Sequence, residues 1–468
     1  MTAGPGSAAA GDRWRLAVLV GCLLISLALY AALAVILGSI PAGWDAPIKF
    51  SLESGPLFRA FTGLPLVDLS PAAFQRALRA VFVLVWLLWG AGALALQGMS
   101  SAELRRRAVV VAIAGGAAML VLVVVCVPTV LSSDLYRQAV YGRMVAYHGL
   151  NPYASPVNAV PNDPLFALAN HHHLSTHYGP AYTLLSALCA LIAPSTALGG
   201  ALAWKAMSAC AALGCAVLAG SVVRSLGGAE ADGQNAQLWL AWNPLLIVES
   251  AASGHIEPIM MLPALAAILL WQQGRVVRGV IALVVSTLTK WVNGLLLPFA
   301  IVREVHRAAP GHRLRTLVRL AGAAGLTLAL LYAPFIAWAW AWAWGGLTRR
   351  GGISDIAMRG AATVGNAPTI PLPQWVLLAG FAALVLGTMR FVARGDWPRL
   401  IATTSALSLV FVLFVNPWPF PWYFLAPLVL AALLPRGRPG FVLRALSVGI
   451  GATMTLSLYT RLLPLAAP

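Results

Sequence analysis

Residues 108–134 read AVVVAIAGGAAMLVLVVVCVPTVLSSD, an apolar run that ends in a single acid, Asp134. No charged side chain interrupts the run before that acid. Spanning the hydrocarbon core of a bilayer takes about 20 predominantly apolar residues. We therefore predict a transmembrane helix over about 108–130, with Asp134 immediately beyond its end.

Apolar runs of similar length recur along the whole chain. Of its 468 residues, 60% are hydrophobic and only 10% are charged, whereas a soluble domain carries about 25% charged residues. The runs are continuous rather than alternating, which excludes an outer-membrane barrel. These features predict an all-α, polytopic membrane protein with about 13 transmembrane helices and no sizeable soluble domain.

The net charge of +17 comes from basic residues in short clusters between the apolar runs. Cytoplasmic loops that face anionic lipid carry such clusters, so the charge indicates a lipid bilayer as partner and no nucleic acid. The cluster Arg105-Arg106-Arg107 directly precedes the run at 108–130. The positive-inside rule then puts this cluster and the N-terminus in the cytoplasm and Asp134 outside. We expect a multi-pass protein of the plasma membrane whose active site faces outward.

The other apolar runs predict the remaining helices. Residues 1–15 are expected to form a cytoplasmic tail, and the first helix is a retained anchor. Residues 180–194 are short for a span and fit a re-entrant or interfacial segment. Residues 303–319 are expected to form the largest inner basic loop, and 345–371 an outer loop. The predicted helices cover about 16–37, 78–97, 201–223, 239–253, 256–271, 280–302 with a break at Lys290, 320–344, 374–392, 400–415, 421–435 and 442–462.

Asp134 opens a polar segment in which several side chains can do chemistry. A carboxylate in this place can accept a proton from an attacking hydroxyl, as a general base does. It can equally be a helix-end carboxylate paired with Arg137. Tyr136, Arg137, Tyr141 and Arg143 have the spacing of a short helix along the surface, and some of them are expected to be interfacial anchors.

Four of the eight histidines cluster at His171, His172, His173 and His177. The cluster suggests a metal, but neither an acid nor a cysteine lies beside it at ligand spacing. Hydrogen bonding of these histidines to a sugar or phosphate, or a plain polar loop, fits better. We therefore predict no cofactor, and the sequence leaves a divalent metal open.

Glu249 and Glu257 are acids that interrupt strongly apolar sequence. Ionisable groups at membrane depth are costly and are functional candidates by default. A turn at Ser253-Gly254 would bring two helix ends together and expose His255 and Glu257. Alternatively, Glu257 only caps the helix that follows, because the helix dipole stabilises acids at an N-terminus.

Lys290 lies in an apolar setting between two runs that are each too short to span alone. Its ammonium needs an anionic partner, either a lipid phosphate or one of the two glutamates. Arg349 and Arg350 can bind the same phosphate from the expected outer loop, or can simply be solvated. Trp422 and Tyr423 end a rigid aromatic segment that can line a lipid or sugar groove or form an interfacial belt.

An ordered set of short motifs follows the acid at the end of the first quoted run. The set is Tyr141-Gly142-Arg143, Gly149-Leu150-Asn151-Pro152-Tyr153, Tyr178-Gly179-Pro180, Trp242-Asn243-Pro244, Glu249, Gly254-His255-Ile256-Glu257, Lys290-Trp291, Asn416-Pro417-Trp418 and Trp422-Tyr423. It resembles the membrane-embedded C-type glycosyltransferases of the GT-C fold. The closest likeness is to the polyprenol-phosphomannose-dependent α-1,6-mannosyltransferases of actinobacteria, and it runs from about residue 105 to 430.

This resemblance implies an outward-facing, inverting enzyme that takes a sugar from a polyprenyl phosphate donor. The sugar is expected to be mannose, passed to a glycan or glycolipid acceptor in α-1,6 linkage. Asp134 matches the acid of the family's first large outer loop, the catalytic base. The expected donor and phosphate ligands are Lys290, Arg137, Arg349 and Arg350. The expected sugar or acceptor ligands are His177, Tyr178, Glu249, His255, Glu257, Trp422 and Tyr423.

The resemblance also implies a division of the chain. Residues 1–107 would add a tail and two transmembrane helices, 108–371 would form the GT-C-like catalytic membrane core with its outer loop 132–180, and 372–468 would add C-terminal transmembrane helices. No GxxxxGK[ST] loop occurs, which fits a lipid-linked donor.

The alternative function is a transporter or flippase for a lipid-linked sugar. In it, Glu249, Glu257 and Lys290 would form a coupling relay near the membrane midplane. We find no internal repeat in the sequence, which disfavours that alternative.

Overall fold

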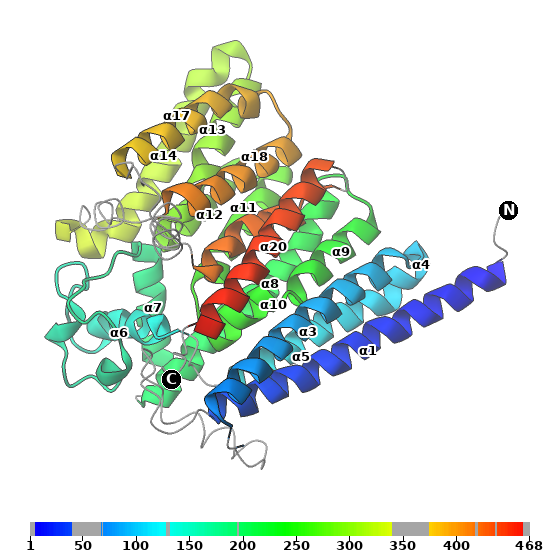
Figure 1. Cartoon of the computed structure of the whole chain (residues 1–468). Helices are drawn as coiled ribbons and strands as arrows, with labels where there is room; N and C mark the ends of the chain where they lie inside the picture. Colours follow the sequence, from blue (N-terminus) through cyan, green and yellow to red (C-terminus); the bar gives the residue numbers. More distant parts are fainter. Residues whose placement is uncertain are drawn as a thin grey trace, which may run out of the picture.

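The computed structural model describes residues 5–39, 67, 69–127, 132–193, 196–338, 374–416, 420–435 and 438–461. Within these ranges the chain is helical and contains no β-strand. The predicted all-α fold class is confirmed. Figure 1 shows long helices running alongside one another, with the short helices α6 and α7 together at one end of the molecule.

Six described helices are long and apolar enough to cross a membrane, and one bent pair, 244–252 with 257–272, makes a seventh candidate span. The protein is therefore a multi-pass membrane protein, as predicted. The six contain α1 (Pro5–Gly38), α3 (Pro71–Gln97), α8 (Ala197–Ser225), α14 (Arg313–Tyr332) with its flanking turns, α17 (Gln374–Ala393) and α18 (Trp397–Val410), which continues through a π turn to Val415.

The other described elements are shorter helices and single turns between them. The α-helices are α4 (Ser101–Glu103), α5 (Val109–Cys126), α6 (Asp134–Ala146), α7 (Pro180–Ile192), α9 (Glu230–Ala241), α10 (Pro244–Ile247), α11 (Glu257–Gln272), α12 (Val276–Thr289), α13 (Leu296–Arg307), α19 (Leu425–Ala432) and α20 (Arg438–Arg461). The π and 3-10 turns are η1 (Leu104–Ala108), η2 (Val157–Ala159), η3 (Phe166–Leu168), η4 (Val248–Ala252), η5 (Trp291–Leu295), η6 (Pro310–His312), η7 (Ala333–Trp338), η8 (Phe411–Val415) and η9 (Pro421–Phe424).

Side-chain caps start several of the long helices. Ser70 and Asp396 accept a hydrogen bond from a backbone N–H in the first turn of α3 and α18, and Thr196 does so for α8. α3 and α18 also carry a proline in their first turn, where a missing N–H costs nothing. These signals explain why α3 begins at Pro71 rather than near residue 78, where the apolar run begins.

Basic residues extend several helices beyond their apolar runs. α1 begins at Pro5, so most of the predicted N-terminal tail 1–15 is helical and continues into the first apolar run. The predicted inner loop 303–319 is wrong, because α13 continues to Arg307 and α14 begins at Arg313. Arginine is a good helix former, so a helix can project past the membrane where hydropathy already falls. The expected outer loop 345–371 lies outside the described residues.

The helices α11 and α12 run in opposite directions between two ends of the molecule. One end holds the junctions before Glu257 and after Thr289, and the other holds the junction at 273–275. α7 has 13 residues, or about 20 Å of helix, which is shorter than the roughly 30 Å hydrocarbon core. It packs across α6 at the end that holds the junctions before Glu257 and after Thr289, where the candidate site lies.

Candidate active site

Helix α6 presents the first acid of the polar segment. Asp134 is its first residue and Arg143 lies in its last turn, which are the ends that the helix dipole favours for an acid and a base. A Cβ on Gly142 would lie 2.3 Å from the backbone of Ser186 in α7. Only glycine therefore permits the two helices to cross this closely, and the crossing fixes where Asp134 lies.

The predicted short helix over these residues is confirmed, but its predicted interfacial anchors are wrong. Tyr136, Arg137, Tyr141 and Arg143 are all buried. The reason is that the segment between α6 and α7 folds back over α6. Tyr141, for example, donates a hydrogen bond to the carbonyl of Leu174.

A buried ion pair ties this folded-back segment to α6. Arg143 Nε donates to both carboxylate oxygens of Asp163, at 3.0 and 2.8 Å. His148 Nε2 lies 3.0 Å from the same carboxylate, whose side chain is fully buried. Asp163 also accepts from the backbone N–H of Leu165. Breaking a hydrogen-bonded buried pair is costly, so this cluster holds the segment in place.

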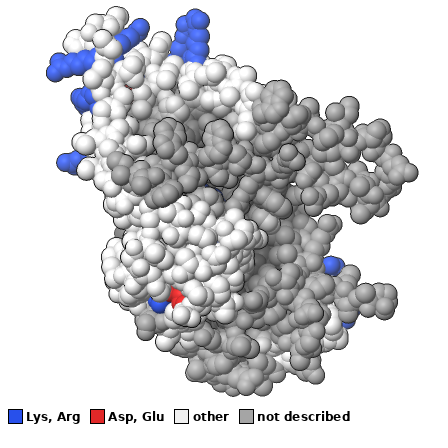
Figure 2. Space-filling view, turned by 90° about the vertical axis from the view of Figure 1, so that its left-hand side faces the viewer, with Lys and Arg blue, Asp and Glu red and all other residues white. Residues whose placement is uncertain are grey.

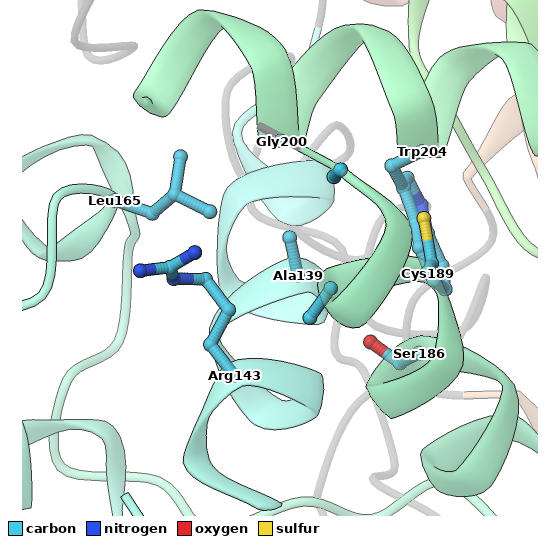
Figure 3. Close-up of a pocket in the computed structure, with 9 residues that line it drawn as sticks. Ala139, Arg143, Leu165, Ser186, Cys189, Gly200 and Trp204 are labelled. Atoms are coloured by element: carbon cyan, nitrogen blue, oxygen red, sulfur yellow. The ribbon is translucent and has the colours of Figure 1, made fainter. Parts of the chain in front are cut away.

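Little free space remains beneath α6. Figure 3 shows a cavity between α6, α7 and α8, with Ala139, Arg143 and Trp204 among its lining residues. Its volume is about 10 Å³, which admits about one water molecule. This cavity is not a substrate site, and the tight packing around it keeps α6 from shifting.

The Asp134 carboxylate is anchored through one of its two oxygens. Arg137 Nη2 donates to Oδ1 at 3.0 Å, and Asn170 Nδ2 approaches the same atom at 3.5 Å. No described residue donates a hydrogen bond to Oδ2, and 19% of the side chain is exposed. Burial raises the pKa of Asp134, but the charges of Arg137 and His255 outweigh it and hold the pKa below its usual range. Asp134 is therefore ionised at neutral pH with one oxygen open.

Gln138 connects α6 to three other parts of the site, and the sequence reading missed it. Its Nε2 donates to the hydroxyl of Tyr178 at 3.1 Å, and its Oε1 accepts from Trp204 Nε1 at 3.2 Å. Its backbone carbonyl accepts from the hydroxyls of Tyr182 and Ser186 in α7. The one available signal was its spacing, because Gln138 lies four residues after Asp134 and so shares a helix face with it.

The predicted turn at Ser253-Gly254 is confirmed. Gly254 has φ +66°, a backbone conformation that side chains other than glycine rarely adopt, and the helices on either side are bent by 119°. The bend brings His255 Nδ1 to 2.9 Å from Glu249 Oε2. The prediction that the turn exposes its polar residues is wrong, because both His255 and Glu257 are buried. The ring of Trp422 stacks on His255, with ring centroids 3.9 Å apart, and covers it.

Lys290 lies at the break between α12 and η5, as predicted. It forms a buried ion pair with Glu257, the first residue of α11. Its ammonium lies over the ring of Tyr423, 4.2 Å from the centroid, and 5.9 Å from that of Tyr178. Of the two partners that the sequence allowed, a phosphate or a glutamate, the structure contains the glutamate.

A close backbone contact sets the position of the loop that carries His177 and Tyr178. A Cβ on Gly179 would lie 2.0 Å from the carbonyl oxygen of Leu288, near the end of α12. The rings of His177 and Tyr178 are 4.3 Å apart. Burial, together with the charge of Asp134, raises the pKa of Tyr178 to about 12. The phenol is therefore neutral and able to donate a hydrogen bond at neutral pH.

The structure thus brings together the predicted site residues that it describes. Acids, bases and aromatic rings from α6, the 147–179 segment, the bend, the α12 break and η9 meet in one cluster. These residues are Asp134, Arg137, His177, Tyr178, Glu249, His255, Glu257, Lys290, Trp422 and Tyr423. Arg349 and Arg350 lie outside the described residues.

Most of the histidine cluster lies apart from this site. His172 Nε2 is 2.9 Å from the carbonyl of Phe166 and its ring stacks on the Phe166 ring. His171 takes a left-handed backbone conformation with φ 51° in the turn before it. No group of three or more His, Cys, Asp or Glu side chains within the described ranges is placed to hold a metal ion. Of the four clustered histidines, His177 joins the site.

Comparison with known proteins decides the family. The model of the family described as alpha-(1->6)-mannopyranosyltransferase, N-terminal domain, matches residues 25–306. The chain belongs to this family. It is 27% identical over 394 residues to alpha-(1->6)-mannopyranosyltransferase A of Mycobacterium tuberculosis, a match that covers 80% of this chain and 75% of that relative. It is 25% identical over 301 residues to the protein of the same name from Corynebacterium glutamicum, covering 61% of this chain and 57% of that relative.

Family membership confirms the resemblance inferred from the ordered motifs and the predicted enzyme class. The protein is a glycosyltransferase of the mannosyltransferase type. The family match includes Asp134, the bend and Lys290 and ends within α13. Trp422 and Tyr423 reach the same cluster from beyond the matched part.

Proposed function

We propose that this mannosyltransferase takes mannose from a polyprenyl phosphate donor and transfers it, with inversion, to a hydroxyl of a glycan or glycolipid acceptor. The linkage formed is α-1,6, as in the relatives' names. The observation that carries the proposal is the state of Asp134. It is an ionised carboxylate with Oδ2 open, at the centre of a cluster of cations and aromatic rings.

The proposed step needs one base and a stabilised leaving group. Asp134 Oδ2 accepts the proton of the acceptor hydroxyl while that oxygen forms a bond to C1 of mannose. The bond from C1 to the phosphate oxygen breaks, and polyprenyl phosphate leaves with the electron pair. A phosphate leaving group next to preorganised cations needs no proton of its own, so a second carboxylic acid is not required.

Arg137 is the described cation that we assign to the leaving phosphate. It lies one helical turn from Asp134, and its Nε is buried without a hydrogen-bond partner among the described residues. A buried donor left without an acceptor is costly. An arriving phosphate oxygen would relieve that cost through a charge-assisted bond. Arg349 and Arg350, which the sequence places in an expected outer loop, are candidates for the same phosphate.

The sequence favoured Lys290 as a ligand of the donor phosphate, and we assign it a different role. Its ammonium already donates to Glu257, whereas Arg137 keeps its buried Nε without a hydrogen-bond partner among the described residues. We assign the pair to holding the rings of Tyr178 and Tyr423, which lie beside the ammonium. With His177 and Trp422, these two tyrosines are the proposed sugar and acceptor contacts. Glu249 and His255 are buried, and we assign them to supporting the ring of Trp422, which stacks on His255.

The outward orientation rests on the distribution of arginines. Arg275 and Arg278 lie at the junction of α11 and α12, which is the end remote from Glu257 and Lys290. The positive-inside rule assigns that end to the cytoplasm and the active site to the outer face. The ionisable cluster lies at helix ends, beneath the 147–179 segment, rather than midway along the helices. This placement favours a transferase over a transporter or flippase for a lipid-linked sugar.

Transfer of radiolabelled mannose tests the proposed donor. Membranes containing this protein should label a glycolipid acceptor from polyprenyl phosphomannose, and should not do so from GDP-mannose when polyprenyl phosphomannose synthesis is blocked. The anomeric configuration of the product, read by nuclear magnetic resonance, should be opposite to that of the donor. Labelling from GDP-mannose under the block would refute the lipid-linked donor, and retention of configuration would refute direct displacement.

A further inference from the structure

A second polar feature lies at the end of the molecule opposite the active site. A cleft there is lined by Gly274, Arg275, Val276, Val277, Arg278 and Arg319, and we call it the arginine cleft. The 16-residue helix α11 begins at the active-site residue Glu257 and ends just before the cleft. At 1.5 Å per residue, α11 puts about 24 Å between the two places. The cleft is therefore not part of the transferase site.

The arginine cleft concentrates positive charge from two helices. Arg275 and Arg278 come from the start of α12, and Arg319 comes from the neighbouring α14. All three are exposed, no acid lines the cleft, and none of the three pairs with an acid of the described chain. The volume of the cleft is about 420 Å³, which is room for a headgroup rather than for one small ion. On the face seen in Figure 2, basic side chains gather mainly at the upper end of the molecule.

The surface next to the cleft is apolar and exposed. Ile281, one turn into α12 from Arg278, is 40% exposed, and Val318 beside Arg319 is 63% exposed. One turn further into α14, nothing lies within 4 Å of the place that a Cβ on Gly322 would take. Only 11% of the most apolar 18-residue stretch of the span that contains α14 is buried against the rest of the protein. The exposed face of α14 is therefore available to lipid chains.

We propose that the arginine cleft binds the phosphate headgroup of an anionic phospholipid, whose acyl chains lie along the exposed faces of α12 and α14. Guanidinium groups bind phosphate oxygens through paired, charge-assisted hydrogen bonds, and three of them face one cleft. A soluble phosphate would use the same arginines, but it would leave the apolar surface beside Ile281 and Val318 uncovered. The combination of a charged cleft with a lipid-facing rim therefore selects a lipid.

Thermal unfolding in a neutral detergent, titrated with added lipid, tests this proposal without requiring activity. Phosphatidylglycerol should raise the Tm of the purified protein, and equal amounts of phosphatidylcholine or of inorganic phosphate should not. The triple variant Arg275→Gln, Arg278→Gln, Arg319→Gln should need at least tenfold more phosphatidylglycerol for the same rise. An equal rise with inorganic phosphate would overturn the lipid assignment, and no rise with phosphatidylglycerol would overturn the site.

A matched variant separates a defined site from diffuse charge. Arg307, Arg313 and Arg315 are exposed, lie around the junction of α13 and α14, and do not line the cleft. Changing these three to glutamine removes the same net charge from the same end of the protein. This control should keep the response to phosphatidylglycerol, and an equal loss in both triple variants would contradict the proposal. The Tm of each variant without lipid shows that it is folded.

Discussion

The buried pair of Lys290 with Glu257 allows a prediction that separates structural from substrate-binding roles. Both side chains are nearly inaccessible, with 7% and 2% exposure. Lys290→Met removes the ammonium and keeps an apolar stem of similar length. In the empty protein, the variant leaves the Glu257 carboxylate buried without its counter-ion. Removing one partner of a buried pair costs about 3–5 kcal/mol, since an uncompensated charge remains.

The size of the expected shift in Tm follows from the chain length. An unfolding entropy of about 2.1 cal/mol/K per residue gives about 1 kcal/mol/K for the 468 residues. Lys290→Met should therefore lower Tm by about 3–5 °C, measured by thermal unfolding in detergent. The double variant Lys290→Met, Glu257→Met removes both charges. It should recover most of the loss, because replacing a buried pair with apolar groups is often neutral.

Donor binding on the same variants completes the test. If the pair only positions neighbouring rings, Lys290→Met should weaken binding of polyprenyl phosphomannose modestly, by less than tenfold. An unchanged Tm together with a large loss of donor affinity would refute the reasoning, because it would mean that the ammonium serves the donor phosphate and not Glu257. Unaltered donor affinity would rule out a phosphate role for Lys290.

Three further predictions concern the base, its support and the orientation of the protein. Gln138→Met should lower kcat about 100-fold with little change in KM, since small misplacements of catalytic groups cost about that much; an unchanged kcat would remove its positioning role. Arg137→Gln should move the acid limb of the pH profile of kcat/KM to higher pH. Arg137 lowers the pKa of Asp134, and the base is lost as the pH falls through that pKa. An acid limb that does not move would contradict this. A cysteine at the exposed Ala159 should react with an impermeant thiol reagent in intact cells, and one at the exposed Ala309 only after lysis; the reverse pattern would overturn the orientation.

The parts of the site that the sequence predicted are the ones that stand out against apolar surroundings. Lys290 and Glu257 were recognisable because a charge at membrane depth demands a partner. Gly254 between two acids indicated the bend, because glycine permits the left-handed backbone that a sharp turn needs. Asp134 was recognisable from its place directly after an apolar run.

The rest depends on how helices cross, which local sequence does not determine. Nothing in the local sequence distinguishes Gln138 from other helix residues. Its hydrogen-bond partners come from α7 and α8, which approach it only in the folded protein. His255 was expected to be exposed, but Trp422, from far along the chain, covers its ring. Arg143 was predicted to be an interfacial anchor. Its partner, Asp163, could not be foreseen because it lies in a segment without a periodic pattern. Each of these errors has the same origin, a tertiary contact between residues distant in sequence.

Turnover of the Asp134→Asn variant tests the central claim most directly. The amide keeps an oxygen that can accept from Arg137 but has no basicity, so folding and donor affinity should remain near those of the unaltered protein. Transfer of mannose from polyprenyl phosphomannose should fall by about 10²–10⁴-fold, the range typical of a lost general base. Turnover close to normal in a folded, donor-binding Asp134→Asn protein would contradict the account.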